Sequence, residues 1–148
     1  MLAGRITDLM DETYNVLECK NECATACHDC LKHYWNQRVQ NILDRHLAKQ
    51  LLDWSRNKKK ADSIPYDRQI NLVKGIKETA NLEGAGFDII FENDRIYGVK
   101  DGRKTEIYVH PAMWNPDDGM IPKGAIPLSD KIALNSMPYA YSIIRNGL

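Results

Sequence analysis

The stretch "LECKNECATACHDCLKHYWNQR", residues 17–38, contains every cysteine of this 148-residue chain. The thiols follow the spacing C-x3-C-x3-C-x2-C. Structural zinc sites take four ligands tetrahedrally, and their cysteines commonly come in pairs two to four residues apart. The spacing therefore predicts a structural metal site with zinc as the expected ion. Its predicted ligands are Cys19, Cys23, Cys27 and Cys30.

Three other uses of these cysteines compete with a zinc site. A disulfide framework needs an oxidising compartment, and no leader directs the chain to one. A redox pair of Cys27 and Cys30 would leave the other two thiols without a role, and such a pair normally follows a strand. Four clustered cysteines also hold iron–sulfur clusters, so that alternative stays open. His28 and His33 are expected to lie beside the ligands rather than to replace one.

Helices are expected on both sides of the cysteines. Apolar residues recur at helical spacing over residues 5–19. Beyond the cysteines, steps of three and four continue through residues 31–56 and predict one long amphipathic helix. Tyr34, Trp35 and Trp54 fit the apolar stripe of that helix, so they are expected in the core rather than on a base-stacking surface. Residues 1–56 thus form a predicted helical module around a four-cysteine knuckle.

A polar stretch separates this module from the rest of the chain. Residues 57–66 carry Lys58-Lys59-Lys60 and contain Ile64-Pro65 near their end, where the residue before proline is biased away from helix, so an exposed basic linker is predicted. The remaining segment, 67–148, is expected to begin with a helix that Asp67 caps. Glycines at 84 and 86 are expected to end that helix.

Strand signals then replace helical ones. Three short runs rich in β-branched and aromatic residues lie within 87–110, separated by Asn93-Asp94 and Asp101-Gly102. Such dipeptides favour hairpin turns, so we predict a three-stranded antiparallel meander. A loop rich in proline and glycine follows, and a C-terminal helix closes the chain. The predicted fold class is α+β: a zinc-stabilised helical N-terminal half with two main helices, and a smaller antiparallel meander with flanking helices.

Charge balance gives no general argument for nucleic acid, because 20 basic and 20 acidic residues leave a net charge of zero. A local strip is nevertheless expected along the second helix and the linker. Cations in such a strip bind phosphates without reading sequence. The alternative, a solvated helix face, stays open. The candidate nucleic-acid-binding residues are Arg38, Arg45, Lys49, Arg56, Lys58, Lys59 and Lys60.

Catalytic patterns are weak in this sequence. It has no G-x-x-x-x-G-K-[ST] loop for nucleotide phosphates. The turn at Asp117 invites a metal-dependent nuclease interpretation, but no Asp/Glu-x-Lys triplet follows it. Cys27 or Cys30 with His33 or His110 could pair as nucleophile and base, yet a metal-bound thiolate is not free to attack. We therefore expect no enzyme; the alternative is a small metal-dependent nuclease or a thiol redox protein.

Location is the last property that the sequence addresses. No apolar run approaches the about 20 residues that a membrane-spanning helix requires. The first residues lack the apolar stretch of a secretory signal, because Asp8, Asp11 and Glu12 interrupt them. A cytoplasmic protein without a membrane partner is expected.

The segment "CATACHDCLKHYWNQRVQNILDRHLAKQLLDW", residues 23–54, resembles the C-terminal four-cysteine domain of superfamily 2 DNA helicases of the MrfA type. The same domain occurs in DrmB of the DISARM anti-phage system. Shared features are Cys-x-x-Cys-Leu, the run Asn36-Gln37-Arg38 and the run Leu43-Asp44-Arg45, and the likeness covers residues 3–55. The helicase motor is absent. The resemblance implies a zinc-binding accessory domain for DNA binding or protein docking, with a helicase or defence-complex subunit as its partner.

Overall fold

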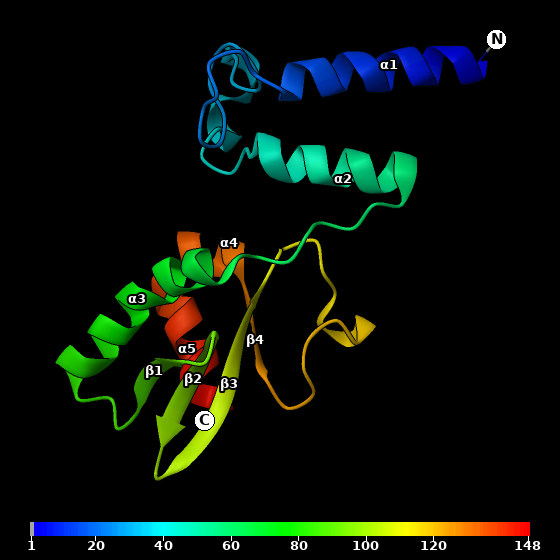
Figure 1. Cartoon of the computed structure of the whole chain (residues 1–148). Coiled ribbons are helices and arrows are strands. Elements are labelled where there is room, and N and C mark those ends of the chain that lie inside the picture. Colours follow the sequence, from blue (N-terminus) through cyan, green and yellow to red (C-terminus); the bar gives the residue numbers. More distant parts are fainter. Residues whose placement is uncertain (1) are drawn as a thin grey trace. The chain divides into compact units, whose positions relative to one another are not determined.

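The computed structural model describes residues 2–148, and the surroundings of the side chains from residue 4 onward. The chain forms two compact units, Met1–Ala61 and Asp62–Leu148 (Figure 1). The boundary between them lies inside the range 57–66 that was expected to be a linker. Residues 58–65 have no helix or strand, so an irregular segment joins the two units. None of the described helices combines the length and the apolar character that crossing a bilayer requires.

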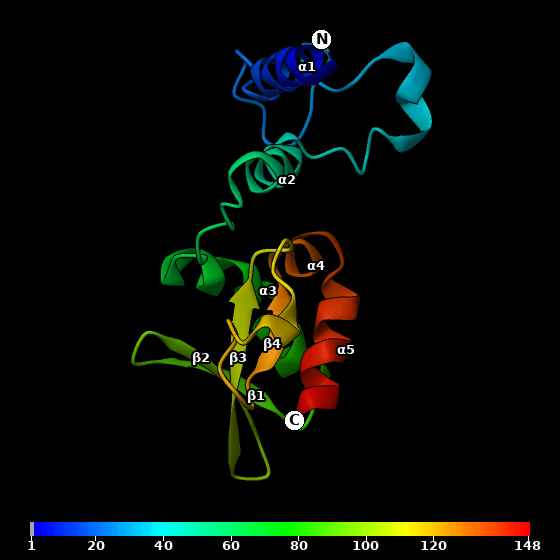
Figure 2. The same ribbon diagram turned by 90° about the vertical axis from the view of Figure 1, so that its right-hand side faces the viewer.

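The first unit consists of two α-helices and the loop that joins them. Helix α1 spans Leu2–Leu17, the 3₁₀ helix η1 spans Tyr34–Val39, and α2 spans Arg45–Asn57. Helices α1 and α2 pack side by side, and the cysteine-bearing loop connects them at one end (Figures 1 and 2). The predicted helix over 5–19 is confirmed, with an earlier start and an earlier end.

The prediction of one continuous helix over 31–56 is wrong. Asp44 has an extended backbone, with φ −139° and ψ 105°, and its carboxylate accepts hydrogen bonds from the backbone N–H groups of His46 and Leu47 at 3.0 Å. An N-cap residue with this extended backbone precedes the first turn of a helix. Asp44 therefore cannot lie inside one continuous helix. The helical spacing of the sequence therefore spans two separate elements, η1 and α2.

The expectation that three aromatic side chains belong to the core is also wrong. Tyr34, Trp35 and Trp54 have 72%, 88% and 43% of their surface exposed. That expectation required one long helix that packs along its whole length. Because η1 and α2 are separate elements, Tyr34 and Trp35 do not belong to the same helix face as Trp54.

The second unit is a four-stranded sheet with three helices. Helix α3 spans Tyr66–Glu83, and the strands are β1 Asp88–Glu92, β2 Arg95–Lys100, β3 Arg103–His110 and β4 Ile126–Ser129. The strands lie in the order β1-β2-β3-β4. The first three are antiparallel, which confirms the meander, whereas β4 pairs with β3 in parallel. Helices α4, Asp130–Asn135, and α5, Met137–Gly147, complete the unit, which includes the short 3₁₀ helix η2 at Pro116–Asp118.

Two predicted helix boundaries in this unit have different outcomes. Gly84 ends α3 in the left-handed conformation, with φ 59°, as expected. Asp67 is not the N-cap, because the cap position is Pro65 and Asp67 lies in the first turn. A negative charge in the first turn is favoured by the positive end of the helix dipole.

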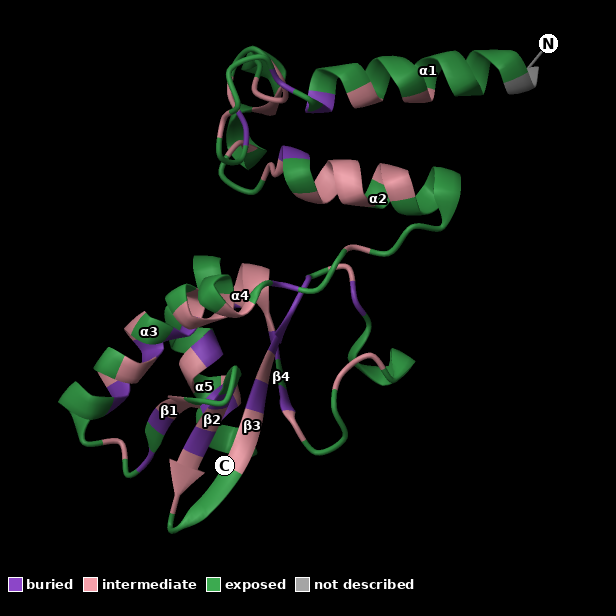
Figure 3. Ribbon diagram, viewed as in Figure 1, coloured by how far each residue is buried: buried purple, intermediate pink, exposed green. Residues whose placement is uncertain are grey.

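The core of the chain lies between α3, α5 and one face of the sheet. Alternate strand residues point to this face, as the pairing of Ile89 with Gly98 and of Ile96 with Ile107 shows. A side chain at Gly98 would collide with Leu148, since a Cβ there would lie 2.7 Å from its Cδ2 atom. Figure 3 shows buried residues throughout this unit, whereas those of the first unit gather near the loop. The α+β class is confirmed.

Candidate metal centre

The loop between α1 and η1 brings the four cysteines together. Their Sγ atoms all lie within 4.8 Å of one another. The Sγ–Sγ distances are 3.5 Å for Cys19 and Cys27, 3.6 Å for Cys23 and Cys30, and 3.8 Å for Cys27 and Cys30. A tetrahedral ion with metal–sulfur bonds of about 2.3 Å separates its sulfurs by about 3.8 Å. Disulfide bonds are about 2.05 Å long, so all four thiols are free and surround a point where a metal ion such as zinc can bind.

The backbone on the α1 side turns sharply to present Cys19 and Cys23. Cys19 and Glu22 both have positive φ values, 32° and 46°, a region that few residues other than glycine occupy. The N–H of Glu22 donates to the carbonyl of Cys19 at 2.9 Å and closes the turn. This turn ends α1 and brings the second thiol back toward the first.

A second turn presents Cys27 and Cys30. The N–H groups of Cys30 and Lys32 both donate to the carbonyl of Cys27, at 3.2 and 2.9 Å. The N–H of Cys27 donates to the Sγ of Cys30 at 3.2 Å. A backbone donor aimed at sulfur stabilises a thiolate, which is the form that binds a metal.

Arg45 joins these turns to α2. Its side chain is only 7% exposed; Nε donates to the carbonyl of Cys23 at 2.8 Å and Nη1 to the carbonyl of Leu17 at 3.1 Å. Its own N–H donates to the carbonyl of Thr25 at 2.8 Å. The first residue of α2 is thereby bonded to the end of α1 and to the loop between the cysteines. Arg45 was predicted to contact nucleic acid, and its burial contradicts that role.

The thiols differ in their affinity for protons. A hydrogen bond from the backbone of Asn21 lowers the pKa of Cys19 from 9.0 to about 7, aided by the Cys27 thiol and opposed by burial. Burial raises the pKa of Cys23 to about 12, and the neighbouring Cys30 thiol adds to the rise. The backbone of Asp29 lowers the pKa of Cys27, but burial and the adjoining thiols outweigh it, so the net direction is upward. When no cation lies between them, four closely packed sulfur atoms therefore resist being ionised at the same time.

Both histidines near the cysteines are exposed and stand outside the cluster. The group of metal-binding atoms in the described chain contains the four cysteines alone at this position, without His28 or His33. His110 belongs to β3 of the second unit, where its buried ring lies 2.9 Å from the carbonyl of Pro111. Within the first unit, the group of metal-binding atoms therefore contains no histidine.

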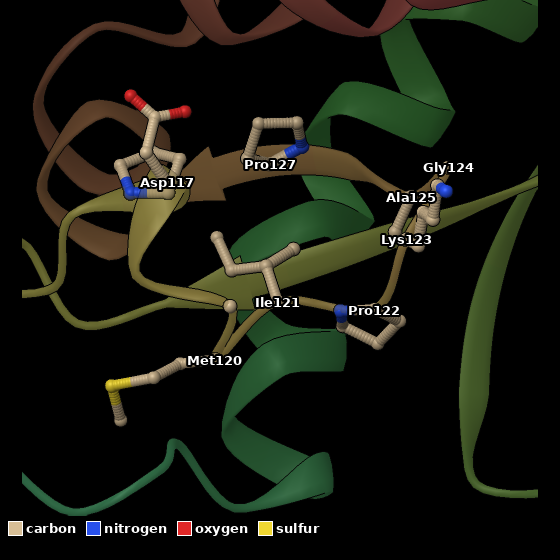
Figure 4. A pocket seen from close by; sticks show the side chains of 10 residues that line it. Asp117, Met120, Ile121, Pro122, Lys123, Gly124, Ala125 and Pro127 are labelled. Atoms are coloured by element: carbon tan, nitrogen blue, oxygen red, sulfur yellow. The ribbon is translucent and has the colours of Figure 1, made fainter.

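Asp117 lies in η2, beside an open hollow of about 710 Å³ (Figure 4). The ten residues that line the hollow include one carboxylate, that of Asp117, and one cation, Lys123; the others are apolar or glycine. Metal-dependent nucleases hold their ions between at least two carboxylates. The lining of this hollow does not provide a second one.

The predicted basic strip is not continuous. Lys49 forms an ion pair with Glu18 at 2.9 Å, whose hydrogen bond raises the pKa of Lys49, and Arg56 pairs with Asp11 at 2.8 Å. Lys58 lies over the ring of Trp54, 4.8 Å from its centre. Lys59 and Lys60 are exposed in the linker, and Arg38 is exposed on η1. With Arg45 buried and Lys49 and Arg56 paired with carboxylates, the remaining candidate cations divide between η1 and the linker.

Sequence reasoning did not identify two contributors to the loop. One is Arg45, which was grouped with the surface cations. The other is the hydrogen bond from Asn21 Nδ2 to Asp29 Oδ2, at 2.5 Å, which links the two cysteine turns. The contacts of Arg45 join residues 22 and 28 positions apart, and the Asn21–Asp29 pair, eight positions apart, matches no metal-ligand or helical spacing.

Comparison with known proteins relates the chain to one curated protein. Druantia protein DruE of Escherichia coli (strain UMEA 4076-1) is 32% identical to it over 83 residues. The match covers 55% of this chain and 4% of DruE, so the chain spans a small fraction of that protein's length. No protein-family model matches the chain, and no solved structure matches it. The resemblance to the MrfA-type domain and to DrmB remains a prediction beside this finding.

Proposed function

We propose that this chain is a non-enzymatic, zinc-binding accessory domain of an anti-phage defence assembly that contains a helicase-like protein. Its similarity to part of DruE, an anti-phage defence protein, supports the biological setting. The observation that carries the molecular role is the cluster of four thiols at the separations of a tetrahedral metal site. Reduced thiols also suit a cytoplasmic protein.

The ligand set supports a structural role for the metal. Four protein thiolates complete the shell of zinc, whereas catalytic zinc sites keep one position for water or substrate. Cys19 follows the end of α1, and Cys30 lies four residues before the start of η1. A zinc ion bound by the four cysteines would hold these two elements together, and its binding energy would contribute directly to folding.

The role of the module in the assembly is DNA binding or the docking of a partner subunit. The exposed cations on η1 and in the linker support contact with phosphates. They are few, so affinity should be modest and should depend on salt. The apolar side chains exposed on α1 and α2, Ile6, Leu9, Leu51 and Trp54, support docking to a protein.

One experiment tests both parts of this proposal. The chain is purified without added metal, its metal content is measured by mass spectrometry, and its binding to fluorescein-labelled single- and double-stranded DNA is followed by anisotropy. We expect about one zinc per chain and a dissociation constant on the order of micromolar at low salt, weaker at physiological salt. Removal of zinc with a chelator should abolish binding, because the loop then loses its shape.

The outcomes separate the two parts. A chain with freely titrating thiols and almost no metal, or a brown protein with iron and sulfide, would refute the zinc assignment. Zinc at full stoichiometry without DNA binding at low salt would retain the zinc module and leave protein docking as its role. DNA binding that survives full metal removal would show that the four cysteines do not organise the binding surface.

A further inference from the structure

The 3₁₀ helix η1 presents two aromatic side chains to solvent. Trp35 and Tyr34 are the two most exposed aromatic residues of the first unit. Their rings meet edge to face, with centroids 5.3 Å apart and planes at 84°. One ring therefore braces the other, while most of the Trp35 surface stays free. Burying an indole of this size would be strongly favourable, so its exposure at a fixed position calls for a ligand.

Hydrogen bonds hold η1 in this shape. Asn36 accepts from the N–H of His33 at 2.9 Å and donates through Nδ2 to the carbonyl of Leu31 at 2.6 Å. The Nε2 of Gln40 donates to the carbonyl of His33 at 3.0 Å and lies 3.3 Å from Asn36 Oδ1. These side chains bond the turn to itself just beyond Cys30. The aromatic pair is thus presented by a braced turn anchored at the metal centre.

The segment that carries the pair is positively charged. Residues 31–43 contain Lys32 and Arg38 and no acidic residue. Arg38 follows Trp35 by three residues, about one turn of a 3₁₀ helix, and makes no ion pair among the residues that the structure describes. The cations of α2 differ, since Lys49 and Arg56 are both paired with carboxylates. The partner expected at η1 therefore combines a flat apolar surface with negative charge.

We propose that η1 binds single-stranded nucleic acid, with Trp35 and Tyr34 stacking on bases and Arg38 contacting the phosphate backbone. Base faces are stacked inside a duplex and become available in a single strand, so stacking selects the single-stranded form. Every base has such a face, and the site should therefore tolerate many sequences. This inference rests on the DNA-binding part of the proposed function and assigns it to η1.

The test uses the zinc-loaded full chain and labelled thymidine and adenosine 15-mers, with a 15-base-pair duplex for comparison. Trp35→Ala should weaken single-strand binding about tenfold, because stacking is lost, and Trp35→Phe should restore much of it. Arg38→Glu should weaken binding and reduce the magnitude of the salt slope by about 0.7, the value for one phosphate contact on a single strand. Trp35→Ala should leave that slope unchanged. The matched control is Tyr139→Ala on α5, which removes an exposed aromatic ring outside the first unit.

Each result decides between this site and another. Unchanged single-strand affinity in Trp35→Ala, with zinc content and circular dichroism equal to the wild type, would overturn the stacking site. If changing Lys58, Lys59 and Lys60 to Glu then removed binding, DNA binding would stand and its site would be the linker. A wild-type chain that binds zinc but no oligonucleotide at low salt would refute the DNA-binding part of the proposed function itself. Equal loss in the Tyr139→Ala control would show an effect that is not specific to η1.

Discussion

At the scale of single residues, the four thiols are unequal although the sequence presents them as equivalent. Cys19 accepts a backbone hydrogen bond that favours its thiolate, whereas Cys23 is placed where burial favours the thiol. A metal ion removes this difference, because every ligand must be deprotonated to bind it. Metal and protons therefore compete for the same four sulfur atoms.

Zinc binding should release protons in a pH-dependent way. At pH 8, Cys19 with a pKa of about 7 is mostly ionised, whereas Cys23 and Cys27, whose pKa values are raised, keep their protons. We expect at least these two protons to be released per zinc at pH 8. Release should be larger, and affinity lower, at pH 6, where Cys19 is protonated too. Calorimetric titrations in buffers of different ionisation enthalpy measure the number.

Magnesium provides the control for this titration, since it prefers oxygen ligands and should release no protons. An affinity for zinc that stays constant between pH 6 and pH 8 would contradict the prediction. So would a release of fewer than two protons at pH 8, which would show that Cys23 or Cys27 is already ionised without metal.

The sequence was sufficient to predict the four metal-binding thiols, but not the side chains that hold their loop in place. Spacing alone predicted the cluster of Cys19, Cys23, Cys27 and Cys30, because ligands of a small metal site are close in the chain. Arg45 was misassigned, since its role depends on carbonyl groups 22 and 28 residues away. A buried arginine and a surface arginine look alike in a sequence until the fold shows which carbonyls surround them.

At the scale of elements, the break before α2 was the main feature that periodicity missed. Apolar residues continue at steps of three and four through η1 and α2, so the pattern counts them as one helix. The side chain of Asp44 favours a break between the two elements. Its carboxylate bonds two N–H groups that have no partner within the helix, which favours a helix start at residue 45. A signal for the break was therefore present as a good N-cap residue inside the periodic stretch.

Removal of this cap should destabilise the first unit. Asp44→Ala leaves two N–H groups without their acceptor and should reduce the free energy of unfolding by about 1 kcal/mol. Asp44→Asn keeps a capping oxygen and should retain most of the stability. Chemical denaturation followed by far-ultraviolet circular dichroism measures both. Asp53→Ala, the same change inside α2, is the control and should cost little, because alanine favours helix interiors. Equal losses in Asp44→Ala and Asp53→Ala would mean that the cap contributes nothing specific.

Strand β4 escaped prediction for a different reason. Only four residues, Ile126–Ser129, form it, and proline at 127 lowers the strand signal. Its pairing with β3 in parallel depends on a connection through 111–125 that carries no regular periodicity. By contrast, the meander β1–β3 was predictable, since each of its turns is announced by adjacent residues.

At the scale of the whole chain, the two units differ in what holds them together. The second unit buries a full apolar core that includes Ile76, Ile89 and Leu128. Among the described residues of the first unit, the buried hydrophobic side chains are those of Leu17, Cys19 and Ala26. Two helices and a loop with so small a core need another source of stability. The metal centre is the candidate for that source.

Loss of one thiol should therefore unfold one unit and spare the other. In Cys30→Ser, the backbone amides of 2–57 should lose protection from hydrogen exchange, while those of 88–110 keep theirs. Hydrogen-exchange mass spectrometry of the full chain resolves the two regions. Wild-type protein treated with a zinc chelator should give the same pattern, and the untreated wild type is the reference. Protection unchanged in both regions would mean that the site is peripheral to the fold, and loss in both would mean that the two units fold together.

The parallel strand at the end of the sheet has a consequence for self-association. Pro127 lies opposite Tyr108, at an edge position where a proline lacks the N–H that an incoming strand would need. The other edge is β1, which begins and ends with the carboxylates of Asp88 and Glu92. Asp88 pairs with Lys77 and Glu92 with Lys104, and such charged side chains oppose burial of the edge against another strand. Both edges of this sheet therefore disfavour the addition of strands from other chains, and with it fibril growth. Edge strand β4 lacks a hydrogen-bond donor at Pro127, and edge strand β1 carries charged side chains at its ends.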